Sequence, residues 1–452
     1  MGLPHQLVSA MIIYDVNMST NVLTITVIRE DNVKCTINCT GRQLKLILVS
    51  IYRLAAFSSL NRAQKASRGQ FMARLFQLQE NCLRLMGHNM ESSGERSPPL
   101  GLRHIVSLVF VLSAEYPMLS YVVYNRDDME LITACLSVAF TNLVTVTKIW
   151  TFLAYKQSFI QMMQSFRQLD SKSQHGTVGY GYVEHGNKLA TFLGRAYSLS
   201  CGFTGLYFML GPIIKIVTNN WRGVPYEREL PMPMKLPFND VESPGYEFGF
   251  IYILFVTIFV VLYASAVDGL FISFAINLRA HFQALQQDIN LLAFGQEEQL
   301  VDKQMADVVD YHVQLLSLSR QLRHIYTPIV FGQFFITSLE VGVIIYQIVT
   351  HLDSIMALLV YFSFFCSIML QLFIYCYGGE VIKVEGLRVG VAIQTSNWHS
   401  ASNTQRRFLI FIMHRSQREV LIKAGFYEAS LANFLGILRA AMSFITLIQS
   451  IE

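Results

Sequence analysis

Charged residues are scarce in this chain of 452 residues: they make up 15% of it, while 52% of its residues are hydrophobic. A soluble protein of this size carries about 25% charged residues. The composition therefore predicts a protein that crosses the lipid bilayer several times. The net charge of +4 is small and spread along the chain, so we expect no nucleic-acid partner.

The sequence also lacks the motifs that carry common enzyme and metal chemistry. No GxxxxGK[ST], HExxH or GxSxG pattern occurs, and the seven cysteines show neither a CxxC pair nor zinc spacing. We therefore predict no enzyme, cofactor or metal site, and interpret the cysteines as buried thiols. Residues 1–14 lack the basic start and compact apolar core of a cleavable signal peptide, so internal helices should direct insertion.

Apolar runs predict an all-α membrane protein with seven transmembrane helices. We expect the helices at 104–124, 131–152, 193–217, 247–275, 328–350, 354–377 and 431–451. The predicted divisions are an N-terminal extension (1–70, with a strand at 22–28), an amphipathic cytoplasmic helix and loop (71–99), helices 1–4 with a proline-rich outer loop at 218–246 (100–275), a cytoplasmic helical segment (276–327), helices 5–6 (328–377), a second cytoplasmic segment (378–430) and helix 7 (431–452). The outer loop is either a lid over a pocket or an ordinary exposed loop, and Gly378-Gly379 indicates a helix end or bend.

Lysine and arginine are concentrated in the loops on one side of the predicted helices. That side carries Arg406, Arg407 and Arg415 among many others, whereas the opposite loops carry few basic residues, such as Arg126 and Arg228. Because basic loops stay in the cytoplasm, we predict a cytoplasmic N-terminus and an extracellular C-terminus.

The last predicted helix carries a polar stripe, although Arg439 is its one charge. A projection at about 100° per residue places Met442, Thr446, Gln449 and Ser450 on one face. Lipid offers such a stripe no partners. It therefore either packs against other helices through hydrogen bonds or lines a water-filled pore.

The residues before this helix form an ordered set of motifs: FIYCYGGE at 373–380, Trp398, MHRSQR at 413–418, LIKAGF at 421–426 and SLANFLGIL at 430–438. In order and spacing this set resembles the C-terminal signature of the insect odorant receptors, a family of seven-helix chemoreceptors. With the hydropathy profile, the resemblance covers 71–452. Residues 1–69 depart from the family's usual start and are either a native extension or an artefact of the gene model.

The resemblance implies a function and a set of partners. The family's inverted topology agrees with the predicted orientation. The chain is expected to be a subunit of a ligand-gated, non-selective cation channel in the plasma membrane of sensory neurons, opened by a small volatile odorant, with the last helix lining the path of the permeant cations. The resemblance also implies assembly with a co-receptor subunit in a heteromeric, tetrameric channel. The co-receptor's long insertion before the fifth helix is absent here, which favours a ligand-tuned subunit.

The resemblance also implies a cytoplasmic anchor domain that joins subunits. Within it we expect Trp398, Arg415, Gln417 and Phe426 to serve assembly. Two helical seams, at 278–292 and 305–325, repeat apolar residues at intervals of three and four. They pack either within the chain or between subunits.

A volatile apolar ligand needs an apolar, aromatic pocket. The outer halves of the second, third, fourth and sixth predicted helices supply aromatic residues, several of which we expect to contact the ligand: Phe140, Phe203, Tyr207, Tyr252, Phe255, Tyr361, Phe362 and Phe365.

Few charges lie inside the predicted helices. Lys148 and Asp268 are near the inferred cytoplasmic ends, so we expect them to snorkel toward water. Glu340, with Thr337 one turn and Gln333 two turns away, is either a buried structural carboxylate or part of an ion path or ligand site.

Three other classes fit less well. A gustatory receptor would end its last helix with Thr-Tyr, five apolar residues and Gln-Phe, which SFITLIQS at 443–450 does not match. A G-protein-coupled receptor would carry an acidic-Arg-aromatic triplet after the third helix and Asn-Pro-x-x-Tyr in the seventh. A secondary transporter would show inverted repeats with broken helices.

Overall fold

The computed structural model describes residues 11–17, 22–28, 34–39, 75–88, 90, 102–173, 179–223, 228–294, 297–352 and 355–451. The chain divides into two compact units, 1–73 and 74–452.

The described part of the first unit is an antiparallel sheet of three strands in the order β1-β2-β3. They are β1 (Met11–Asn17), β2 (Val22–Ile28) and β3 (Lys34–Cys39). Met11 pairs with Ile28, and Leu23 pairs with Cys39. The strand predicted at 22–28 is thus confirmed, and β-branched residues dominate it, as strands favour.

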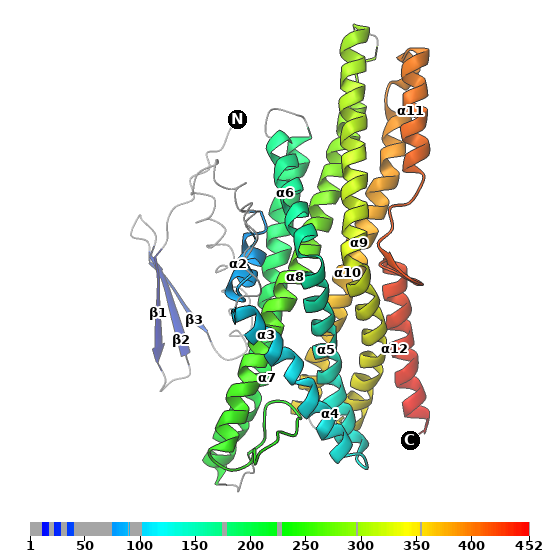
Figure 1. Cartoon of the computed structure of the whole chain (residues 1–452). Coiled ribbons are helices and arrows are strands. Elements are labelled where there is room, and N and C mark those ends of the chain that lie inside the picture. The colour runs from blue at the N-terminus through cyan, green and yellow to red at the C-terminus, as the bar shows by residue number, and fades with distance from the viewer. Residues whose placement is uncertain are drawn as a thin grey trace. The chain divides into compact units, whose positions relative to one another are not determined.

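The second unit is helical (Figure 1). Its helices are α2 (Gln77–Leu85), α3 (Leu102–Ser113), α4 (Glu115–Tyr124), α5 (Met129–Ala154), α6 (Lys156–Ser173), α7 (Tyr180–Arg222), α8 (Gly245–Asn290), α9 (Glu298–Thr350), α10 (Ile355–Thr395), α11 (Asn403–Ser416) and α12 (Leu431–Ile451). A 3₁₀ turn (Trp398–Ser400) precedes α11, and a short hairpin of β4 (Lys423–Ala424) and β5 (Tyr427–Glu428) precedes α12.

Six segments among the described residues are long and apolar enough to cross a membrane: Ile105–Tyr124, Met129–Ala154, Tyr180–Trp221, Gly245–Asn290, Glu298–Thr350 and Leu358–Thr395. With α12 as a further apolar helix of 21 residues, the predicted all-α membrane fold is confirmed. The first span is divided at Ala114 into α3 and α4. The sides on which the termini lie stay a prediction.

Several helices run far beyond a membrane thickness. At 1.5 Å per residue, the 53 residues of α9 extend about 80 Å, against about 30 Å of hydrocarbon. The cytoplasmic segment predicted at 276–327 therefore consists of continuations of α8 and α9. Helix α10 likewise continues to Thr395, so Gly378-Gly379 does not end a helix, and a bend at this pair stays a prediction.

The two seams of the sequence are buried inside this chain. In the first, Leu278, Phe282 and Leu285 are fully buried, and in the second so are Leu315 and Ile325. They belong to one hydrophobic core, in which α8 packs against α7, α9 and α10. The seams therefore serve packing within the chain, and their alternative role between subunits is excluded by this burial.

Capping side chains mark the observed starts of α5 and α11. The Asp128 carboxylate accepts hydrogen bonds from the backbone N–H groups of Glu130 (3.0 Å) and Leu131 (3.1 Å), which caps α5. Ser402 and Gln405 form a reciprocal capping box at the start of α11.

Helix α2 is shorter than the amphipathic helix predicted from residue 71. Leu75 and Cys82 are buried, as their shared face requires, but Leu85 is 67% exposed. Polar contacts fix the helix instead: Glu80 pairs with Arg167 at 2.7 Å, and Gln79 donates to Ser273 on α8 at 3.4 Å.

Candidate ligand cavity and polar hub

A cavity of about 130 Å³ lies among α5, α7, α8 and α10. Its wall is mainly apolar, with a smaller set of polar side chains. The apolar residues are Met118, Val138, Phe208, Met232, Val256, Val260, Val261, Ala264, Phe364, Ile368 and Leu370, with Cys201 and Gly205 beside them. The polar residues are Thr141, Asn142, Tyr197, Ser200, Thr204, Thr257, Ser367 and Gln371.

The proline-rich loop before α8 supplies one part of this wall. Met232 lines the cavity. The loop is held in place because the Lys235 N–H donates to the Pro117 carbonyl at 3.0 Å and the Cys135 thiol donates to the Pro233 carbonyl at 3.2 Å. This loop therefore contributes Met232 to the cavity wall, and its role as a lid stays a prediction.

None of the eight aromatic residues predicted to contact a ligand lines this cavity. Phe140, Phe203, Tyr207, Phe255 and Phe365 are each adjacent in sequence to a lining residue: Thr141, Thr204, Phe208, Val256 and Phe364. One position along a helix is a rotation of about 100°. The prediction thus identified helices that form the cavity, but the residues it named lie on the helix faces beside the cavity. A ligand role for the eight residues stays untested.

The eight aromatic residues are either exposed or packed against side chains outside the cavity wall, and Phe140 and Tyr207 are half-buried. Phe203 and Phe362 are 71% and 55% exposed, so in a bilayer they face lipid or a neighbouring chain. The Tyr252 hydroxyl bonds to Ser113 at 2.8 Å, and Phe255 packs beside Phe110 with ring centroids 5.6 Å apart. Tyr361 packs beside His351, and Phe365 packs against the core. Small polar residues in apolar spans avoid lipid. Their positions could therefore have indicated which helix faces line the cavity.

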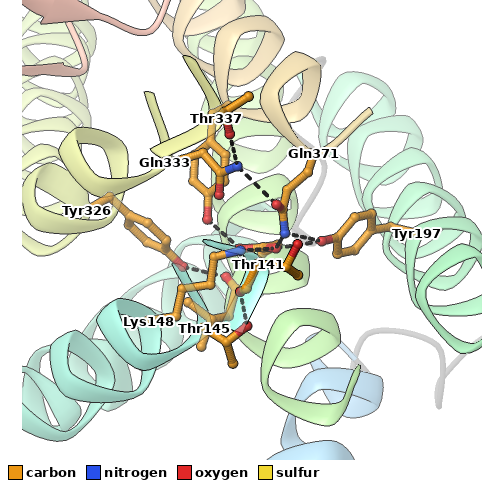
Figure 2. Close-up of polar contacts among 11 residues, drawn as sticks. Thr141, Thr145, Lys148, Tyr197, Tyr326, Gln333, Thr337 and Gln371 are labelled. Atoms are coloured by element: carbon orange, nitrogen blue, oxygen red, sulfur yellow. Dashed lines mark hydrogen bonds and ion pairs between the residues drawn. The ribbon is translucent and has the colours of Figure 1, made fainter. Parts of the chain in front are cut away.

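Beside the cavity lies a buried polar hub centred on Asp268 of α8. Figure 2 labels three of its partners, Lys148, Tyr197 and Gln371. Lys148 of α5 donates to the Asp268 carboxylate at 2.7 Å, and both side chains are at most 1% exposed. Tyr197 of α7 donates at 2.5 Å, Gln371 of α10 at 2.9 Å, and Tyr375 of α10 also donates. Four donors satisfy the carboxylate. The prediction that Lys148 and Asp268 snorkel to water is wrong.

The hub continues toward α9. Gln371 accepts a hydrogen bond from Gln333 at 2.9 Å, and Gln333 also donates to Thr337 at 2.9 Å. Glu340 is 2% exposed and accepts a hydrogen bond from Thr141 at 2.5 Å. Since Thr141, Tyr197 and Gln371 also line the cavity, the cavity wall and the hub share side chains.

Helix α12 is only partly covered by this chain. Phe434, Ile437 and Leu438 pack against the core, whereas Met442 is 58% exposed and Arg439 is exposed. The side chains of the other three predicted pore residues, Thr446, Gln449 and Ser450, lie outside those that the structure describes. Their role stays a prediction.

Three residues predicted for assembly lie in or beside α11, whereas Phe426 lies between β4 and β5. Phe426 is 78% and Trp398 is 47% exposed, and Gln417 is exposed while Arg415 is half-buried. Three further exposed apolar side chains occur on α11: Phe408, Ile410 and Phe411. Contiguous exposed apolar side chains are typical of a protein interface. The Arg415 guanidinium reaches the Arg418 carbonyl at 3.5 Å.

Comparisons with known proteins agree with this architecture. The family model described as 7tm Odorant receptor matches residues 128–442. Odorant receptor 82a of Drosophila melanogaster is 61% identical over 385 residues, covering 84% of this chain and all of the relative. Odorant receptor 47a of the same species is 27% identical over 393 residues, with the same shares covered.

Solved structures show the same fold. The insect olfactory receptor OR5 from Machilis hrabei superposes with a TM-score of 0.68 at 16% identity, over 85% of this chain and all of that one. The same receptor in complex with eugenol gives a TM-score of 0.70. From its sequence match, its relatives and its fold, the chain belongs to the seven-transmembrane odorant receptor family.

Proposed function

We propose that this chain is the ligand-tuned subunit of an odorant-gated, non-selective cation channel in the plasma membrane of sensory neurons. The N-terminus lies in the cytoplasm and the C-terminus outside. The ligand is a small volatile molecule that binds in the cavity among α5, α7, α8 and α10.

The observation that carries this proposal is the cavity itself. Its volume of about 130 Å³ is close to that of apolar cavities of about 150 Å³, which bind benzene-sized molecules. Its apolar wall stabilises such a ligand by roughly 25 cal/mol for each Å² of apolar surface removed from water. The few polar side chains, such as Asn142 and Ser200, would orient the ligand. The structural relative solved with eugenol binds a small aromatic compound.

Helix α12 is the proposed pore helix. Met442 would share its exposed face with Thr446, Gln449 and Ser450. This face would surround a central axis together with the equivalent helices of the other subunits. Such a ring carries no acidic side chain, so it discriminates weakly among cations.

A co-receptor is the proposed partner in a heteromeric, tetrameric channel. The exposed side chains of Trp398, Gln417 and Phe426, and the half-buried Arg415, would make this contact. Aromatic and arginine side chains are enriched at such interfaces.

Whole-cell recording tests the proposal. The chain is expressed with and without a co-receptor, and a broad panel of volatile compounds is applied. We expect cation currents from a subset of compounds only when both subunits are present. Equal responses in cells that carry the co-receptor alone would contradict the proposal.

A further inference from the structure

One helix, α10, lines the cavity, donates a hydrogen bond to Asp268 and contacts the start of α12. Gln371 lines the cavity and donates to Asp268. Two turns further on, Gly379 and Glu380 meet the residues that begin α12. No proline interrupts α10, so Gln371 and Gly379 are about 12 Å apart along one continuous axis.

Gly379 brings the backbone of α10 against the segment before α12. A Cβ at this position would overlap the carbonyl oxygen of Ala429 and lie 2.9 Å from its Cβ. Gly378 makes a second close approach, where a Cβ would lie 2.6 Å from the Phe271 ring of α8. Gly378 thus lets α10 pack closely against α8. Gly379 lets the backbone of α10 contact the backbone of Ala429, two positions before α12.

Glu380 and Phe373 fasten the first turn of α12. The Glu380 carboxylate accepts a hydrogen bond from the backbone N–H of Leu431, the first residue of α12, at 3.2 Å. A carboxylate at a helix N-terminus satisfies a free N–H and complements the helix dipole. Phe373 packs edge-on against Phe434 at 5.4 Å. A displacement of α10 therefore moves the start of α12 with it.

We propose that Gly379 and Glu380 are positioning residues that couple the ligand cavity to the pore helix. A ligand that displaces Gln371 or its neighbours on α10 changes the position of α12 through the Gly379–Ala429 contact and the Glu380–Leu431 hydrogen bond. This coupling rests on the proposed function, in which the cavity binds the ligand and α12 lines the pore.

The test compares Gly379→Ala, Glu380→Ala and Glu380→Gln with Gly436→Ala, whose Cβ on α12 would meet nothing within 4 Å. The probe is the panel compound that gives the largest wild-type current. Surface protein, binding of that compound in radiolabelled form, and maximal current are measured on complexes with the co-receptor. Glu380→Gln keeps an oxygen that can accept from Leu431, so it serves as the conservative rescue.

Gly379→Ala and Glu380→Ala should lower the maximal current per surface complex by about tenfold, within the usual range of coupling between two sites. Binding should stay within about twofold of wild type, since neither residue lines the cavity. Glu380→Gln should retain more current than Glu380→Ala, and Gly436→Ala should behave as wild type.

Unchanged current in both Gly379→Ala and Glu380→Ala would overturn the coupling while leaving the proposed function intact. Parallel loss of binding and current would overturn the coupling as well. Failure of both variants to reach the surface would also overturn it, because the two residues would then serve folding alone. An absence of odorant-evoked current in wild-type complexes would instead contradict the proposed function itself.

Discussion

Lys148 of α5 and Asp268 of α8 form an ion pair with a 2.7 Å separation in the interior of the helical unit, and neither side chain is more than 1% exposed. Two tyrosines and a glutamine complete the hydrogen bonding of the carboxylate. A buried pair is weak evidence of net stabilisation, but the loss of one partner leaves an uncompensated charge.

Breaking this pair should destabilise the protein. Lys148→Met or Asp268→Leu alone should each lower the free energy of unfolding by about 3–5 kcal/mol. The double variant should recover much of this loss, because no unpaired charge is left. Thermal unfolding of purified protein in detergent measures the effect. Additive losses in the double variant would show that the two side chains do not depend on each other.

The hub also shows what the sequence could and could not predict. The membrane helices were predictable because each must bury its backbone in lipid with an apolar stretch of sufficient length, as 131–152 does within α5. The pairing of Lys148 with Asp268 was not, because 120 positions separate them and only tertiary packing brings them together. The same limit applies to the cavity, since the sequence predicts which helices are apolar but not how each is rotated. Gly378-Gly379 does not end a helix because glycine serves close helix packing as well as helix ends.

Acid should destabilise the part of α9 that contains His312. Burial, with the nearby Arg415 guanidinium, lowers the pKa of this imidazole from 6.5 to about 4. The unfolded chain therefore binds a proton more readily than the folded protein below pH 6.5. The contribution of neutral His312 to the free energy of unfolding is therefore fully present above pH 6.5. Between pH 6.5 and pH 4 the free energy of unfolding should fall by up to about 1.4 kcal/mol per pH unit.

His312→Leu removes this contribution, so its stability should depend less on pH between 6.5 and 4. It also removes a buried ring nitrogen that has no hydrogen-bond partner among the described residues. Thermal unfolding at several pH values compares this variant with His185→Leu, which changes an exposed histidine. Identical pH profiles for the two variants would exclude His312 as the source of acid sensitivity.

Assembly should depend on the exposed tryptophan beside α11. Trp398→Ala should reduce recovery of the co-receptor in pull-downs several-fold, because large aromatic side chains dominate interface energies. Trp221→Ala is the matched control, since Trp221 is 88% exposed at the end of α7. Normal recovery with Trp398→Ala would count against an interface at this position.

The pore assignment predicts a face-specific response to thiol reagents. Thr446→Cys and Gln449→Cys, in complexes that conduct, should react with a water-soluble reagent and lose current. Phe444→Cys and Ile448→Cys, which helical periodicity places on other faces, should not. The same response at all four positions would refute the polar stripe as the pore lining.

The central claim is that a small apolar ligand acts in the cavity among α5, α7, α8 and α10. Val256 lines this cavity and is 2% exposed, while Ile258, two positions along α8, is 42% exposed and points elsewhere. Whole-cell dose–response curves for Val256→Phe and Ile258→Phe, at matched surface expression, test the claim most directly. Filling the cavity should raise the half-maximal odorant concentration by about tenfold or more, a cost of at least ~1.4 kcal/mol, while Ile258→Phe keeps the wild-type curve. A wild-type curve for Val256→Phe would show that the ligand acts elsewhere.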